Sequence, residues 1–201
     1  MYNLISSIFS KFLYFCLIVF LLFFHQLTFS NPTASNSVNI LHQALLKIHK
    51  NKITNSEFLK IVESSYNVEK MISAIIGGRW KNISDQNKDR LQKSFRKYIA
   101  KNYISQFRKI KNPEFRNIEE KKIGEKYWLI NSKLILTNEE IKIDYLLTFE
   151  NDQWKIFDIL LAGSISEIAT KKSEFQKHLA DGNYEVLIKK LENTKNEITF
   201  N

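Results

Sequence analysis

The sequence contains a single cysteine, Cys16, which lies inside an apolar run near the N-terminus. If that run is removed on export, the remaining chain has no thiol, which excludes disulfides, thiol catalysis and cysteine metal sites. The fold must then be stabilised by packing alone. Glycine is also scarce: only Gly77 and Gly78 are adjacent among five glycines, so the chain lacks a phosphate-binding glycine loop.

Other catalytic and metal-binding patterns are missing too. His42, His49 and His178 are not spaced as ligand pairs on a helix, and no serine lies in a nucleophile elbow. Asp158 interrupts an apolar strand, where a partly buried carboxylate needs a donor such as Arg79 or a helix N-terminus. A catalytic role for this carboxylate requires an acid partner that the sequence does not offer. We therefore expect no catalytic residues, no metal ion and no cofactor.

Residues 1–30 have the features of a secretory signal peptide. Lys11 supplies a positive charge, and the apolar run Phe12–Phe24 that follows is too short for a comfortable membrane span. Thr28 and Ser30 provide small side chains for cleavage after Ser30. An uncleaved N-terminal anchor is the alternative, and both alternatives place the rest of the chain outside the cytoplasm.

We expect residues 31–201 to form a single domain, because their number suits one domain and 44% of the whole chain is hydrophobic. Without the signal peptide the chain has 29 basic and 21 acidic residues, a net charge of +8. A basic exported protein suits anionic partners such as phospholipid headgroups or an acidic protein face. The sequence is rich in lysine, asparagine and isoleucine, so a compositional bias of the source genome is an alternative explanation of the positive net charge.

The longest amphipathic helix is predicted over residues 85–110, with Ser84 as its N-cap. Large apolar side chains recur on one face at steps of three and four: Leu91, Phe95, Tyr98, Ile99, Tyr103, Phe107 and Ile110. A shorter helix over residues 66–76 precedes it and ends at Gly77. Trp80 lies in the connection, where it is either a packing anchor or part of a cavity wall.

Four further helices are predicted from spacing and caps. They cover residues 38–49 after a flexible start at 31–37, residues 56–64, a segment from Ser164 or Ser166 to Leu179, and residues 184–191.

Between the helices, four strands joined by short polar turns predict an antiparallel sheet. They cover residues 116–124, 127–136, 140–150 and 154–161. Alternation places Ile141, Ile143, Tyr145, Leu147 and Phe149 on one face, and Leu146, Phe157, Ile159 and Leu161 on the other. This is more apolar surface than one short helical layer covers. Core packing, a protein partner or a bound lipid would account for the surplus.

Several segments, taken in order, resemble the periplasmic lipid-binding MlaC family, also called the toluene-tolerance family. They are YNVEKM, GGRW, ISDQ and FRKYIAKNY within residues 66–107, followed by IDY, WKIFDI, GSISEIATKKSEF and DGNYEVLIKKL within residues 143–191. The chain departs from the family pattern at Ser84, where many members have proline, and at Asn183, where many have a second glycine.

The resemblance implies an α+β fold in which an antiparallel four-stranded sheet packs against several helices and encloses an elongated apolar cavity. It implies a monomeric periplasmic shuttle that carries phospholipid between an inner-membrane ABC transporter and an outer-membrane complex, maintaining outer-membrane lipid asymmetry. A hopanoid carrier of the same family is the alternative. The residues expected to line the lipid cavity are Trp80, Phe95, Ile99, Tyr103, Trp128, Ile143, Tyr145, Leu147, Trp154 and Ile156.

Two other classes of function stay open at this point. One is an exported small-molecule enzyme of similar architecture, which the missing acid/base pair disfavours. The other is a basic protein that binds a membrane surface or nucleic acid through residues 88–101. Because the signal peptide directs the chain out of the cytoplasm, we expect no nucleic-acid partner.

Overall fold

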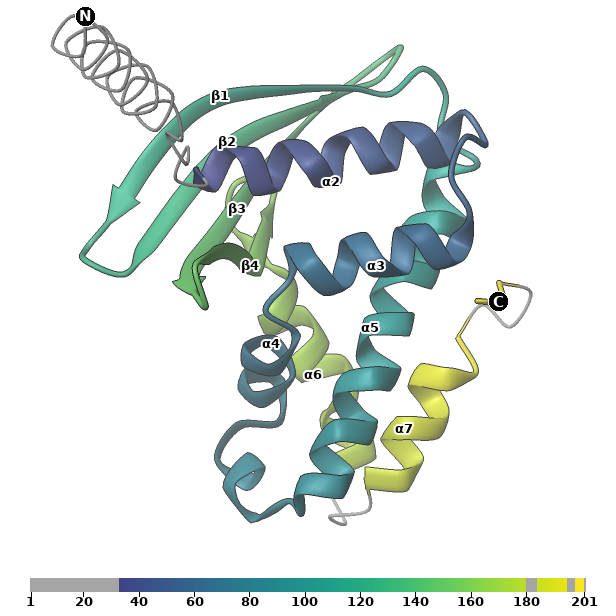
Figure 1. Ribbon diagram of the computed structural model, residues 1–201, viewed down its shortest axis with the longest axis vertical. Coiled ribbons are helices and arrows are strands. Elements are labelled where there is room, and N and C mark those ends of the chain that lie inside the picture. Colours follow the sequence, from purple (N-terminus) through teal and green to yellow (C-terminus); the bar gives the residue numbers. More distant parts are fainter. Residues whose placement is uncertain (1–32, 180–183, 195–197, 201) are drawn as a thin grey trace, which may run out of the picture. The chain divides into compact units, whose positions relative to one another are not determined.

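The computed structural model describes residues 33–179, 184–194 and 198–200, so the expected signal peptide and its cleavage site lie outside the described residues. The helices are α2 (Ala34–His49), α3 (Asn55–Ser65), α4 (Val68–Ile76), the 3-10 helix η1 (Gly77–Asn82), α5 (Asp85–Phe107), α6 (Glu167–Leu179) and α7 (Tyr184–Glu192). The strands are β1 (Glu114–Ile123), β2 (Tyr127–Ile135), β3 (Glu140–Glu150), β4 (Gln153–Leu161) and β5 (Ile165–Ser166). The predicted α+β class is confirmed (Figure 1).

The strands form one antiparallel sheet in the order β1-β2-β3-β4-β5, as hairpin connections require. The four predicted strands are confirmed, and the structure adds the two-residue strand β5. After β4, Ala162 and Gly163 adopt φ values of 50° and 76°, so the chain reverses sharply. Ile165 and Ser166 then pair with Leu161 and Leu160 at the edge of the sheet.

A β-bulge at Phe157 overturns the predicted alternation along β4. Leu147 pairs with Ile156, but the preceding β3 residue, Leu146, pairs with Asp158. The extra residue reverses the side of every later residue in β4. Ile159 and Leu161 therefore share the face of Tyr145 and Ile143, whereas strict alternation placed them on the opposite face.

The helices begin where polar side chains cap them. The Thr33 hydroxyl accepts a hydrogen bond from the Asn36 amide at 3.2 Å, so α2 begins at Ala34 and includes most of the expected flexible start. In α3, Thr54 and Glu57 form a reciprocal capping box, so the helix begins at Asn55, one residue before its predicted start at Ser56. At the other end of α4, Gly77 has φ 72° and stops the helix as predicted.

The long helix α5 is confirmed, with Ser84 as its N-cap. It ends at Phe107 rather than at Ile110, because Asn112 adopts φ 47° and Pro113 follows it into β1. Most of its apolar stripe is buried, including Leu91 and Phe95. The helix therefore forms a wall of the core, as its periodicity predicts.

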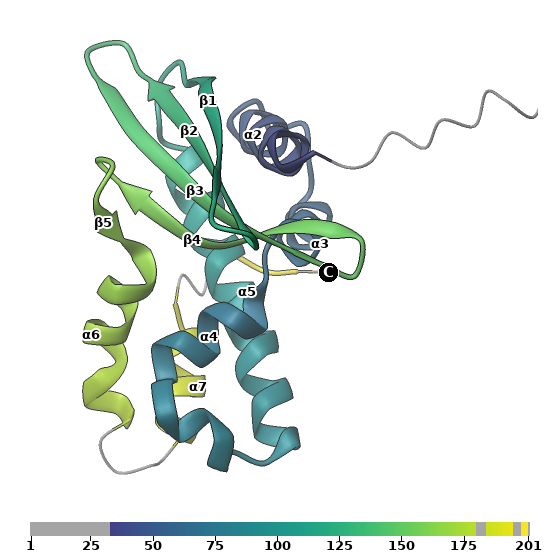
Figure 2. The same ribbon diagram turned by 90° about the vertical axis from the view of Figure 1, so that its left-hand side faces the viewer.

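The helices cover the sheet and continue beyond it. Helix α2 contacts β1, β2 and β4, while α4 and α6 contact each other and β4. Figure 2 shows α6 leaving the end of β5 and running beside α4, with α5 on the other side of α4. Helix α7 contacts both α5 and α6. Within the described ranges, no helix combines the length and apolar character needed to cross a membrane.

Candidate functional site

A cavity of about 220 Å³ lies between α4, α5, α6 and the end of β4. Its walls are mainly apolar and aromatic, and a few polar groups join them. The residues lining it are Tyr66, Met71, Ile75, Phe95, Tyr98, Ile99, Asn102, Tyr103, Gln106, Ile159, Leu161, Glu167, Ile168 and Lys171.

Three elements build the apolar walls. The aromatic stripe of α5 contributes Phe95 and Ile99 on successive turns, and the buried face of α4 contributes Ile75. The wall from the sheet is formed by Ile159 and Leu161, which face the cavity side because of the bulge at Phe157. The cavity therefore depends on a backbone irregularity as well as on helix packing.

A pair of tyrosine hydroxyls lies in this otherwise apolar wall. The hydroxyls of Tyr66 and Tyr103 are 2.8 Å apart and hydrogen-bonded, and Tyr66 is held by a parallel bridge to Ile156 in β4. Burial raises the pKa of Tyr66 well above its ordinary value, and the charge of Glu167 adds to that rise. Burial also raises the pKa of Tyr103 to about 12, with Glu167 again adding to the effect. Both hydroxyls are therefore protonated at neutral pH.

Four polar residues line the cavity where it approaches solvent, and we call them the polar rim: Asn102 and Gln106 on α5, Glu167 and Lys171 on α6. Burial lowers the pKa of Lys171, but its hydrogen bond to Glu174 and its interaction with Tyr98 outweigh this and raise the pKa overall. Lys171 therefore stays positively charged at neutral pH.

The first turn of α6 is held to the sheet by Asp158. Its carboxylate accepts hydrogen bonds from the Ser166 hydroxyl at 2.6 Å, the Ile168 amide at 3.1 Å and the Ile159 amide at 2.8 Å. This confirms the structural interpretation in which a helix N-terminus supplies the donor. Arg79 is not the partner, since its guanidinium donates to the backbone carbonyl of Leu179.

The ten residues expected to line the lipid cavity are divided among three places. Phe95, Ile99 and Tyr103 line the cavity. Ile143, Tyr145, Leu147 and Ile156 are buried in the core on the inner face of the sheet. Trp80 is half-buried in η1, and Trp128 packs edge-to-face on Trp154 at 5.8 Å near the turns of the sheet.

The remaining lining residues were missed by sequence reasoning. Met71 and Ile75 lie on the buried face of the helix predicted over residues 66–76, but the sequence did not show what this face packs against. Glu167, Ile168 and Lys171 come from the helix after the sheet, and no local pattern indicates that this helix folds back beside α4 and α5. Core and cavity positions have the same periodicity, so sequence alone does not separate them.

A second buried polar pair lies in the core under α2. The His42 ring stacks on Phe115 with centroids 3.9 Å apart, and its Nε2 shares a 3.0 Å hydrogen bond with the Tyr145 hydroxyl. Burial lowers the pKa of His42 to about 3, so the imidazole is neutral at physiological pH. Among the residues that the structure describes, no three His, Cys, Asp or Glu side chains group together as metal ligands.

The family model of the MlaC protein matches residues 32–193. No curated protein matches the sequence. Among solved structures, the chain is similar to a phospholipid-binding protein from Ralstonia solanacearum, solved in complex with a phospholipid, at 13% identity and a TM-score of 0.66. That likeness covers 82% of this chain and 95% of the other, and at this identity it concerns the fold alone. Because the family model spans most of its length, the chain belongs to the MlaC family.

Proposed function

We propose that this protein binds a phospholipid, with acyl chains in the cavity between α4, α5, α6 and β4 and the headgroup at the polar rim. The observation that carries this proposal is the mainly apolar cavity of about 220 Å³, which reaches solvent beside four polar side chains. The fold that this chain shares with a protein solved in complex with a phospholipid also supports it.

Hydrophobic transfer supplies the driving force. Each methylene group that leaves water contributes about 0.8 kcal/mol, so burying ten of them gains roughly 8 kcal/mol, which corresponds to micromolar affinity before other costs. A cavity of about 220 Å³ is smaller than the roughly 300–1,000 Å³ of typical ligand sites. We therefore infer that the walls move apart when a lipid enters.

In the cell, we propose, the protein is a periplasmic carrier. Residues 1–30 would direct export and be removed, and residues 31–201 would form the single lipid-binding domain. As a monomer, it would receive or deliver phospholipid at an inner-membrane ABC transporter and at an outer-membrane complex. Membership of the MlaC family supports this role.

We propose a binding protein rather than an enzyme. The acidic residue that the sequence singled out, Asp158, already accepts three hydrogen bonds that attach α6 to the sheet. Among the described residues, Glu167 is the only acidic side chain lining the cavity, and no histidine lines it. This lining offers no acid/base pair for hydrolysis.

The test is mass spectrometry of an organic extract from protein exported by a bacterial host and purified without detergent. We expect about one phospholipid per protein. Ile99→Trp fills the cavity and should reduce the bound lipid several-fold, whereas Ile123→Trp, at an exposed position of β1, should not. Extracts without lipid, from protein that is folded by circular dichroism, would refute the proposal. A hopanoid in place of phospholipid would select the alternative carrier.

A further inference from the structure

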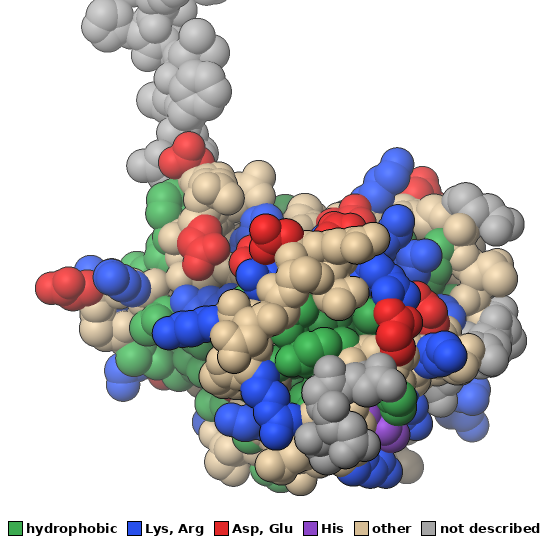
Figure 3. Space-filling view, turned by 90° about the horizontal axis from the view of Figure 1, so that it is seen from below, with side chains coloured by type: hydrophobic (Ala, Val, Ile, Leu, Met, Phe, Trp, Pro, Cys, Tyr) green, Lys and Arg blue, Asp and Glu red, His purple; other side chains and the backbone are tan. Residues whose placement is uncertain are grey.

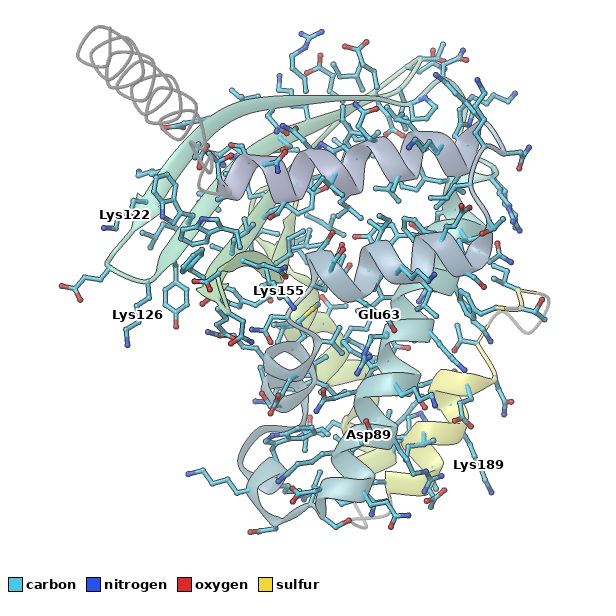
Figure 4. The ribbon with its side chains drawn as sticks, viewed as in Figure 1. Glu63, Asp89, Lys122, Lys126, Lys155 and Lys189 are labelled. Atoms are coloured by element: carbon cyan, nitrogen blue, oxygen red, sulfur yellow. The ribbon has the colours of Figure 1, made fainter. Side chains whose placement is uncertain are left out.

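The charges that line the cavity balance, although the chain as a whole has a formal net charge of +9. Glu167 and Lys171 are the charged side chains of the lining. Other lysines lie elsewhere: Lys122 and Lys126 project from the β1–β2 hairpin and Lys189 from α7 (Figure 4). On the helical end, basic and acidic side chains are mixed around exposed apolar atoms (Figure 3). The rim therefore gives no net attraction to a net-negative headgroup.

Glu167 has no partner of its own at this rim. It precedes Lys171 by four residues, a spacing that usually forms an ion pair on a helix. Lys171 instead donates to Glu174 at 2.7 Å and lies 5.5 Å from the Tyr98 ring centroid. Within the part of the chain that the structure describes, the Glu167 side chain makes no hydrogen bond or ion pair.

Glu167 lines the cavity together with Tyr66 and Tyr103. Its charge raises the pKa of both Tyr66 and Tyr103, which places it within electrostatic reach of their hydroxyls. A half-buried carboxylate beside apolar walls loses part of its hydration without gaining a partner. A cationic group on a bound ligand would restore the lost interaction.

The anionic part of a headgroup has a separate place at the rim. The backbone amides in the first turn of α6 are not available to bind a phosphate. The Ile168 amide donates to Asp158 and the Ala169 amide donates to the Ser166 hydroxyl. Lys171 is the cation among the described lining residues, and it lies four residues, about 6 Å along the helix axis, beyond Glu167. A phosphate and an ammonium joined through two carbons can span that separation.

We propose that the polar rim selects phospholipids with a zwitterionic headgroup, with Glu167 pairing with the ammonium and Lys171 with the phosphate. This inference rests on the proposed lipid-binding function and names the class of lipid that the same site takes.

The test measures headgroup selection directly. Delipidated protein is incubated with vesicles of equal parts phosphatidylethanolamine and phosphatidylglycerol, separated from them, and its lipid identified by mass spectrometry. We expect the wild type to enrich phosphatidylethanolamine about fivefold. Glu167→Gln should bring the ratio of the two lipids close to one, and Glu167→Lys should favour phosphatidylglycerol.

Glu125→Gln is the matched control, because it removes the same charge from the β1–β2 turn, away from the cavity. It should keep the wild-type preference. An equal ratio in the wild type, or an unchanged ratio in both Glu167 variants, would overturn this inference while leaving lipid binding intact. Absence of any lipid from folded wild-type protein would instead overturn the proposed function, and this inference with it.

Discussion

The buried imidazole of His42 makes the stability of this protein depend on pH in a defined window. In the unfolded chain, a histidine takes up a proton below about pH 6.5. In the folded protein, burial against Phe115 and Tyr145 lowers the His42 pKa to about 3. Between these values the unfolded state binds one more proton than the folded state. Stability is therefore full above pH 6.5 and is lost as the pH falls toward 3.

The size of the effect follows from proton linkage. Each pH unit below 6.5 removes up to about 1.4 kcal/mol, so the free energy of unfolding at pH 5.0 should be about 2 kcal/mol lower than at pH 7.5. Any folded pKa of His42 below about 4 gives nearly the same loss at pH 5.0. Most carboxylates stay ionised in this range, so the histidine contribution is separable from general acid denaturation.

Urea unfolding followed by tryptophan fluorescence measures this loss. With a slope near 2 kcal/mol per molar urea, the midpoint should fall by about 1 M between pH 7.5 and 5.0. His42→Gln keeps a polar group near the Tyr145 hydroxyl but does not titrate, so its midpoint should change much less. His49→Gln, on the same helix, leaves His42 in place and should keep the wild-type dependence. Parallel curves for wild type and His42→Gln would refute the reasoning.

Two further predictions concern hydrogen bonds around the cavity. Asp158→Asn should lower the free energy of unfolding by about 1–3 kcal/mol and speed amide exchange at the start of α6, because the carboxylate accepts three hydrogen bonds there. The same change at the exposed Asp152 is its control, and equal urea midpoints for the two variants would contradict the prediction. Tyr66→Phe and Tyr103→Phe should each cost about 1 kcal/mol, since each leaves the partner hydroxyl unpaired. The double variant should cost less than the sum in urea unfolding, and strict additivity would show that the pair does not interact.

The elements of this fold were predictable because local signals specify them. The aromatic stripe of α5 and its Ser84 cap indicated both the helix and its start. The turn at Gly77 and the four hairpin strands followed in the same way. The start of α2 was misplaced because Thr33 was taken as part of a polar leader, although threonine is a good N-cap.

The candidate site was only partly predictable. Phe95, Ile99 and Tyr103 were chosen for their apolar spacing, and they line the cavity. Tyr145 was chosen for the same kind of reason, yet it is buried against His42 in the core. A large apolar side chain has the same spacing whether it meets another side chain or an open cavity, so periodicity does not separate the two.

Local sequence patterns specify the helices, the strands and the order of the hairpins, because each depends on neighbours within a few positions. The composition alone excludes thiol chemistry after residue 30. The tertiary structure decided the cavity. The bulge at Phe157 turned Ile159 and Leu161 inward, and the packing of α6 beside α4 brought Glu167 to the rim. The bulge and the helix packing both depend on contacts between segments far apart in the chain. No local sequence pattern shows how packing and backbone strain balance in such contacts.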